Sequence, residues 1–124
     1  MRRLAVGLVA VALLAACGGS SGGGGGSAQP AGSIQVTMTE FKFDPSTITH
    51  ASGNVVFWLV NSGSTQHDLA VRDSSGKTIA TSELVSAGDT KEFDVNGIAA
   101  GTYTIYCTQP GHEASGMKGT LTVT

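Results

Sequence analysis

The 124-residue sequence has few of the residues on which most enzymes depend. It holds three histidines and two cysteines. It contains no Ser/His/Asp order, no His-Glu-x-x-His pair and no glycine-rich loop that follows a strand and opens a helix. It also shows no internal repeat and no helical periodicity longer than a turn or two. These absences exclude the common hydrolytic, metalloprotease and phosphate-binding chemistries, and we expect that the protein is not an enzyme.

Basic residues are also scarce. The chain has seven Lys and Arg against nine Asp and Glu, and two of the basic residues are Arg2 and Arg3 at its start. The rest of the chain is therefore mildly acidic. This balance argues against a nucleic-acid partner, and it permits attraction to a basic patch on a protein partner.

The start of the chain has the pattern of a targeting segment. Residues 1–16 combine the charged start Met1-Arg2-Arg3 with an apolar stretch too short to span a bilayer. The sequence Leu14-Ala15-Ala16-Cys17 resembles the lipobox of bacterial lipoproteins. That resemblance implies cleavage before Cys17 and lipidation of its thiol. An ordinary secretory signal that happens to end before a cysteine is the alternative.

A Gly/Ser-rich tract follows, and it has almost nothing apolar to bury. We expect residues 17–33 to form a lipidated cysteine and a flexible linker with a reach of roughly 20–25 Å. The linker would connect the lipid anchor to one folded domain at residues 34–124. Such an anchor implies an extracytoplasmic location on a bacterial membrane, at the periplasmic or the outer cell-surface face. With Cys17 lipidated, Cys107 has no partner for a disulfide.

From residue 34 onward the pattern is that of β-strands. Residues 34–39 alternate apolar and polar side chains, and residues 54–60 are nearly all apolar. Turn signals separate further strand-like runs at 67–73, 78–80, 90–95, 102–107 and 120–124. Short strands with frequent turns predict an all-β fold, an antiparallel β-sandwich with Greek-key connections.

One stretch, residues 106–119, concentrates metal-binding side chains. It offers a thiolate, an imidazole and a thioether, from Cys107, His112 and Met117. Soft sulfur ligands with imidazole suit copper, and two His and one Cys with a weak axial Met make an electron-transfer copper site. The set needs a second histidine, and His67 is the candidate, at the start of the apolar run His-Asp-Leu-Ala-Val. His50 lies in a loop with no partner ligand nearby in sequence, and we expect it to be a solvated surface histidine. An ordinary hairpin loop is the alternative.

The spacing within this stretch indicates how the loop closes. Pro110 and Gly111 favour a turn between the cysteine and the histidine. We expect Gly116 and Gly119 to let the backbone turn on either side of Met117. The loop then leads into a strand, so that both of its ends are held by a sheet.

The loop C-T-Q-P-G-H-E-A-S-G-M, with an upstream histidine, resembles the copper loop of the cupredoxins, the type 1 blue copper proteins. It is most similar to auracyanin and azurin, while plastocyanins typically have fewer residues between Cys and His. The resemblance covers residues 34–124 and implies one copper ion that cycles between Cu(I) and Cu(II). It also implies that His67, Cys107 and His112 are the strong ligands of this ion. Met117 would be its weak axial ligand. Many cupredoxins have Asn after the first histidine, where Asp68 stands here; Asp68 can still accept a hydrogen bond from Thr108.

These observations predict a membrane-tethered one-electron carrier. We expect a monomer that meets a redox protein donor and a redox protein acceptor transiently. Too few histidines are left for a second, catalytic copper. A copper-binding or trafficking lipoprotein is the alternative, although Met-rich and His-rich tracts are absent, and a module of a copper enzyme complex is a third possibility. Pro110, Gly111, Ala114 and Gly116 near His112 carry no charge, and only Glu113 nearby is ionised. In the cupredoxins that this loop resembles, the loop histidine reaches the surface through an apolar patch. The resemblance therefore implies that His112, and not His67, is the solvent-accessible ligand.

Overall fold

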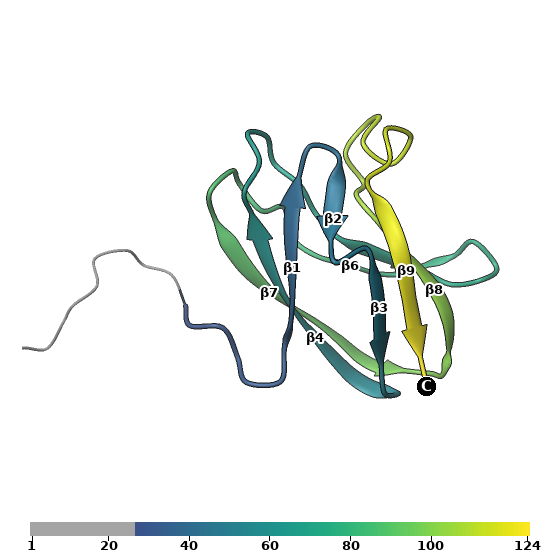
Figure 1. Ribbon diagram of the computed structural model, residues 1–124. Coiled ribbons are helices and arrows are strands. Elements are labelled where there is room, and N and C mark those ends of the chain that lie inside the picture. The colour runs from purple at the N-terminus through teal and green to yellow at the C-terminus, as the bar shows by residue number, and fades with distance from the viewer. Residues whose placement is uncertain (1–26) are drawn as a thin grey trace, which may run out of the picture.

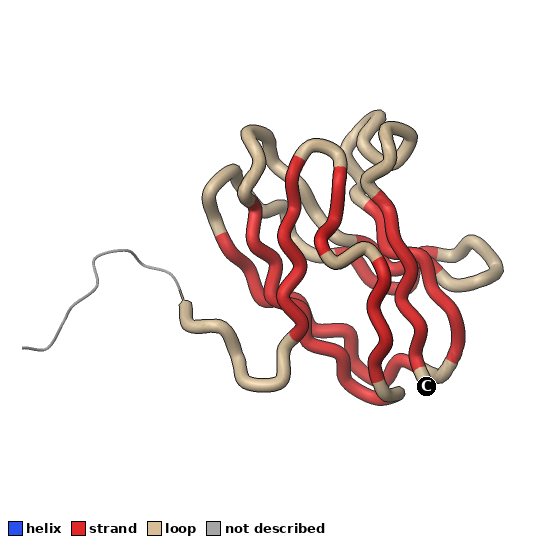
Figure 2. Tube along the Cα trace, in the orientation of Figure 1, coloured by secondary structure: helices blue, strands red, loops and turns tan. Residues whose placement is uncertain are grey.

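The computed structural model describes residues 27–124, and every regular element in this part of the chain is a β-strand (Figure 2). The strands are β1 (Ile34–Thr39), β2 (Lys42–Asp44), β3 (Thr47–His50), β4 (Gly53–Asn61), β5 (Ala70–Arg72), β6 (Thr78–Thr81), β7 (Thr90–Ile98), β8 (Gly101–Tyr106) and β9 (Lys118–Val123). Residues 27–124 include no helix long and apolar enough to cross a membrane. The predicted signal peptide, Cys17 and the start of the predicted linker lie outside the described residues.

The strands form two sheets, as the predicted β-sandwich requires. One sheet has the order β2-β1-β4-β7 and the other the order β3-β9-β8-β5-β6. The predicted β-sandwich is confirmed, but its two sheets are mixed and not purely antiparallel, because β1 pairs with β4 and β3 pairs with β9 in parallel. The chain leaves the first sheet after β2 and passes through β3 in the second sheet before β4 returns beside β1. Alternating side chains predict strands, but they do not reveal these crossings.

The core lies between the sheets and follows from the alternation along each strand. In β1, Val36 and Met38 are completely buried, and in β4 the same holds for Val55, Phe57 and Leu59. The opposite sheet contributes Val71, Ile105, Leu121 and Val123, all at most 3% exposed. Burying each such side chain stabilises the fold by roughly 1.5–3 kcal/mol. This core gives the surrounding loops a fixed frame.

Several connections gather at one end of the sandwich, at the top of Figure 1. They include the turn between β1 and β2, the segment after β4, the segment that leads into β7, and the loop between β8 and β9. Parallel pairing of β1 with β4 brings the carboxyl ends of these strands to the same edge. Antiparallel pairing of β8 with β9 brings the loop at residues 107–117 to that end as well.

Gly119 has a different role from the one we predicted. It lies within β9 and not in a turn. A Cβ at this position would stand 2.2 Å from the backbone oxygen of Ser46. The glycine therefore permits a close approach between β9 and the chain entering β3, where Thr120 N donates to Ser46 O at 2.8 Å.

Candidate metal centre

His67 lies between β4 and β5 and is held by a single backbone bridge. Its N–H donates to Val85 O at 3.1 Å, and Val85 N–H donates to His67 O at 2.8 Å. The predicted strand at 67–73 is therefore too long, since β5 begins only at Ala70. The side chain of His67 is completely buried. The bridge thus fixes a buried ring at the end of the sandwich.

Asn61 supports the same segment from inside. It is 1% exposed, and its Nδ2 donates to Thr65 O and to Val85 O, both at 2.8 Å. Its Oδ1 accepts from Gly63 N at 2.9 Å. The sequence analysis did not identify Asn61, because an asparagine after a strand is typical of a turn. Here the Asn61 side chain forms hydrogen bonds with backbone groups that lie outside the strand ladders.

The loop at residues 107–117 is closed by its own backbone. Cys107 directly follows β8, and its N–H donates to Met117 O at 3.1 Å. Met117 N–H donates to His112 O at 3.0 Å. Gly111 and Gly116 have φ values of 79° and 111°, where glycine is favoured. These bonds place the three predicted ligands of the loop next to one another.

Three of the predicted ligand residues bring their metal-binding atoms close together. His67 Nδ1 and His112 Nδ1 are 3.2 Å apart, and Cys107 Sγ lies 3.5 Å from His112 Nδ1 and 4.0 Å from His67 Nδ1. Two donor atoms that bind one ion at about 2.0–2.3 Å lie roughly 3–4 Å apart. The spacing and the mixed nitrogen and sulfur donors therefore fit a single copper ion. The fourth predicted residue, Met117, is completely buried in the adjoining core.

Burial also acts on the cysteine. Cys107 is 1% exposed, and burial raises the pKa of its thiol, while backbone N–H groups act in the opposite direction. Without metal the thiol therefore holds its proton at neutral pH. The thiolate is the form that binds metal, so binding must displace that proton.

Asp68 ties the two ligand segments together through the hydrogen bond to Thr108 that its position after His67 allows. Thr108 N–H donates to Asp68 Oδ1 at 2.7 Å, and the Thr108 hydroxyl donates to Asp68 Oδ2. Asp68 is 3% exposed. The carboxylate thus joins the residue after His67 to the residue after Cys107.

The turn between β1 and β2 contacts both histidines, and the sequence analysis did not identify it. Glu40 Oε1 lies 3.1 Å from His67 Nε2. The same carboxylate accepts from the backbone of Thr65 and Ser64, which lowers its pKa to about 2. Phe41, 40% exposed, meets the His112 ring edge to face at 4.8 Å between centroids. A charged and an apolar residue at a hairpin turn give no local signal of a metal site.

The two histidines differ in exposure in the way we predicted. His67 is completely buried, whereas His112 is partly exposed. Pro110, Gly111 and Ala114 beside it are exposed. His112 is therefore the ligand that reaches the surface.

An ion pair holds the outer side of the loop. Arg72 Nη2 lies 2.6 Å from Glu113 Oε1, and the Arg72 guanidinium stacks on the Tyr106 ring at 4.4 Å. Arg72 ends β5, so the pair fastens the loop to the second sheet. The bond to Glu113 raises the pKa of Arg72 further above its usual range.

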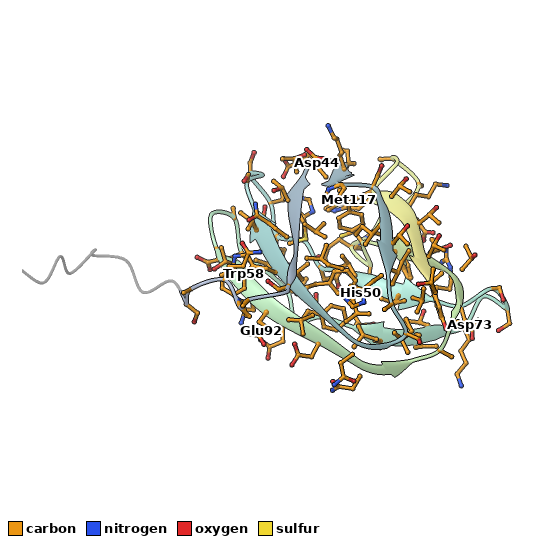
Figure 3. All side chains as sticks on the ribbon, turned by 60° about the horizontal axis from the view of Figure 1, so that its bottom comes forward. Asp44, His50, Trp58, Asp73, Glu92 and Met117 are labelled. Atoms are coloured by element: carbon orange, nitrogen blue, oxygen red, sulfur yellow. The ribbon has the colours of Figure 1, made fainter. Side chains whose placement is uncertain are left out.

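His50 does not take part in the site. It ends β3 and pairs in register with Val123 near the end of β9, whereas Met117 directly precedes β9 (Figure 3). Its Nδ1 lies 2.8 Å from Ala51 O. Two of the three histidines therefore form the site.

The fold and the donor set together define a β-sandwich protein with one type 1 copper site, held by two histidines, a cysteine and a methionine. A sequence model of the family described as copper binding proteins, plastocyanin/azurin family, matches residues 30–124. The chain belongs to this family, the cupredoxins.

Individual relatives agree with this assignment. Plastocyanin from Dryopteris crassirhizoma is 40% identical over 95 residues, covering 67% of this chain and 88% of that protein. Azurin from Pseudomonas denitrificans is 41% identical over 56 residues, or 43% of each chain. Among solved structures, auracyanin A, a "blue" copper protein from Chloroflexus aurantiacus, has a TM-score of 0.67 at 25% identity and covers 74% of this chain and 98% of its own.

Proposed function

We propose that the protein is a one-electron carrier that exchanges electrons with redox proteins through its copper site and is not itself an enzyme. The observation that carries the proposal is the unequal exposure of the two histidines. His67 is completely buried, while His112 is partly exposed on a loop of small residues. Bound copper supplies the one-electron couple. The exposed ring gives a partner a short path to it, and the buried segment keeps water away.

The surface around His112 suits brief encounters. The exposed neighbours Phe41, Pro110 and Ala114 carry no charge, and Glu113 is paired with Arg72. Transient redox partners bury little surface, so a small apolar face is sufficient.

The test is to load the mature protein with copper and measure electron exchange with small redox complexes. We expect an intense thiolate-to-copper band in the visible spectrum, reversible voltammetry and fast bleaching of the band on reduction. The alternative of copper trafficking predicts rapid transfer of copper to a copper-free acceptor protein or chelator. Slow exchange together with rapid loss of copper would contradict the carrier and favour trafficking.

We also propose that the carrier is anchored to a bacterial membrane through lipid on Cys17, at the periplasmic or the outer cell-surface face. The support is the sequence Leu14-Ala15-Ala16-Cys17 and the Gly/Ser-rich tract that follows it. In this proposal the Gly/Ser-rich tract acts as a tether that would let the copper end turn towards partners in or beside the membrane.

Mass spectrometry of the protein from its native host tests the anchor. We expect the mature chain to begin at a lipidated Cys17 and to sediment with membranes. The Cys17→Ser variant is expected to lack both the lipid and that new start. An unmodified Cys17 in the native protein would contradict the anchor without affecting the copper site.

A further inference from the structure

The carboxylate of Glu40 lies beside His67 and is surrounded by hydrogen-bond donors. Its Oε1 accepts from Ser64 N at 2.8 Å, from Thr65 N at 2.9 Å and from the Thr65 hydroxyl at 3.0 Å. The same oxygen lies 3.1 Å from Nε2 of His67. These donors lie 24 to 27 residues further along the chain. The contact is therefore a tertiary one.

Gly63 leaves the space that the Glu40 carboxylate occupies. A Cβ at position 63 would lie 2.6 Å from Oε1 and 2.8 Å from Oε2 of Glu40. Any larger residue there would push the carboxylate away from His67. On its other side, Gly63 N–H donates to Asn61 Oδ1. The backbone around Gly63 is thus shaped to admit Glu40.

The direction of the hydrogen bond between Glu40 and His67 follows from these contacts. Glu40 Oε1 accepts from the N–H groups of Ser64 and Thr65, and a carboxylate has no proton of its own to donate. His67 must then donate from Nε2. A neutral imidazole carries one N–H, so its Nδ1 holds a lone pair. This Nδ1 is the nitrogen that faces Cys107 Sγ and His112 Nδ1.

A carboxylate behind a metal-binding histidine has two known physical effects. It fixes the tautomer and the orientation of the ring, and it makes the other nitrogen a stronger donor. A charged acceptor does this more strongly than a neutral one, because charge-assisted hydrogen bonds are roughly twice as strong. Stronger donation favours Cu(II), the more highly charged ion, over Cu(I).

We propose that Glu40 is a positioning residue of the copper site, which sets the metal-binding tautomer of His67 before metal arrives and biases the bound ion towards Cu(II). The inference rests on the copper site and not on electron transport. The carboxylate does not touch the metal. It acts through the ring of His67.

The first test uses Glu40→Gln, which keeps a side-chain oxygen for the same donors and removes the charge. We expect the ratio of Cu(II) to Cu(I) affinity to fall about tenfold, within the range seen for such outer partners. For a one-electron couple this corresponds to a reduction potential higher by about 59 mV.

Glu113→Gln is the matched control. Glu113 also lies at this end of the molecule but pairs with Arg72 and not with a ligand ring. Its pair is partly exposed and screened by salt, so we expect the affinity ratio to change less than about twofold. An equal shift in both variants would mean that Glu40 acts only as a distant charge, and it would overturn the proposal.

The second test needs no copper. In the copper-free protein, the nitrogen chemical shifts of the His67 ring report its tautomer. We expect a protonated Nε2 and an unprotonated Nδ1 in the wild type, and a mixture of tautomers in Glu40→Ala. A protonated Nδ1 in the wild type would overturn the proposal. If Glu40→Ala does not fold, the wild-type spectrum and the reduction potential of Glu40→Gln still test the proposal.

Discussion

His67 and His112 present the same ring nitrogen to one ion, but the protein holds them in opposite ways. The segment around His67 is held by contacts between residues far apart in the sequence, namely Glu40 with His67, Asn61 with Val85 and Asp68 with Thr108. The loop around His112 is closed mainly by its own backbone, with Cys107 and Met117 bonded across its base. One ligand is enclosed, and the other is carried on a surface loop.

This difference separates two tasks. Enclosure keeps the orientation and electronic character of one ligand constant, because its contacts come from packed elements that do not move independently. A loop closed by local bonds brings one of its three ligands, His112, to the surface, while Cys107 and Met117 stay buried. Each half of the site can therefore be disturbed by itself.

The largest expected effect comes from the loop. Cys107→Ser removes the thiolate, so we expect the visible charge-transfer band to vanish and copper affinity to fall by orders of magnitude. The absorption spectrum after copper addition checks this. His50→Ala is the control, since His50 lies away from the site and its loss is expected to leave the band intact. A band that survives in Cys107→Ser would remove the basis for the site.

The next effect comes from cutting the connection between the two segments. Asp68→Ala leaves Thr108 N–H without its acceptor, and we expect the free energy of unfolding to fall by about 1–3 kcal/mol. Denaturant unfolding of the copper-free protein measures this. Asp68→Asn keeps an acceptor for Thr108 and is expected to lose clearly less. Equal stability of Asp68→Ala and the wild type would show that the two segments are held independently.

The proton that Cys107 loses when copper binds gives a test of the loop segment by itself. Burial raises the pKa of Cys107, so the copper-free thiol is protonated at neutral pH and loses its proton when copper binds. Copper affinity is therefore expected to rise by about tenfold per pH unit up to that pKa and to level off above it. Calorimetry in buffers of different ionisation enthalpy counts the protons released. Copper affinity that is independent of pH near neutrality would contradict a protonated thiol.

The smallest expected effect concerns the surface. Ala114→Asp places a charge beside His112, and we expect electron self-exchange to slow several-fold at low salt and less at high salt. Ala51→Asp adds the same charge beside His50, away from the site, and is expected to change the rate much less. Similar slowing in both variants would mean that electrons leave by another face.

The ligands were predictable because three of them lie within eleven residues, Cys107 to Met117, and their types specify soft-metal chemistry. The strands were predictable where side chains alternate, as in β1. The parallel pairs were not, because pairing direction depends on how the chain crosses between the sheets. Gly119 was recognised as special, but a close approach to Ser46 cannot be read from neighbours in sequence.

The residues that support the ligands could not be predicted for a related reason. Glu40, Phe41 and Asn61 give no sign of metal binding by type, and they become part of the site through contacts with residues 24 or more positions away along the chain. Asp68 differs from them, because its place directly after His67 marked it as able to accept from Thr108, although only the structure shows that it does so. Sequence patterns thus indicate what binds the metal better than what supports it.

Glu40 and Phe41 are neighbours in one short turn, yet one faces the enclosed histidine and the other faces the exposed one. Neither is a ligand, and Phe41 lies outside the buried core. In the proposed electron carrier, substitutions at these two adjacent positions are therefore expected to adjust the reduction potential and the choice of partner separately. A lineage, or an engineer, could retune such a carrier within a single codon pair while the metal ligands stay unchanged.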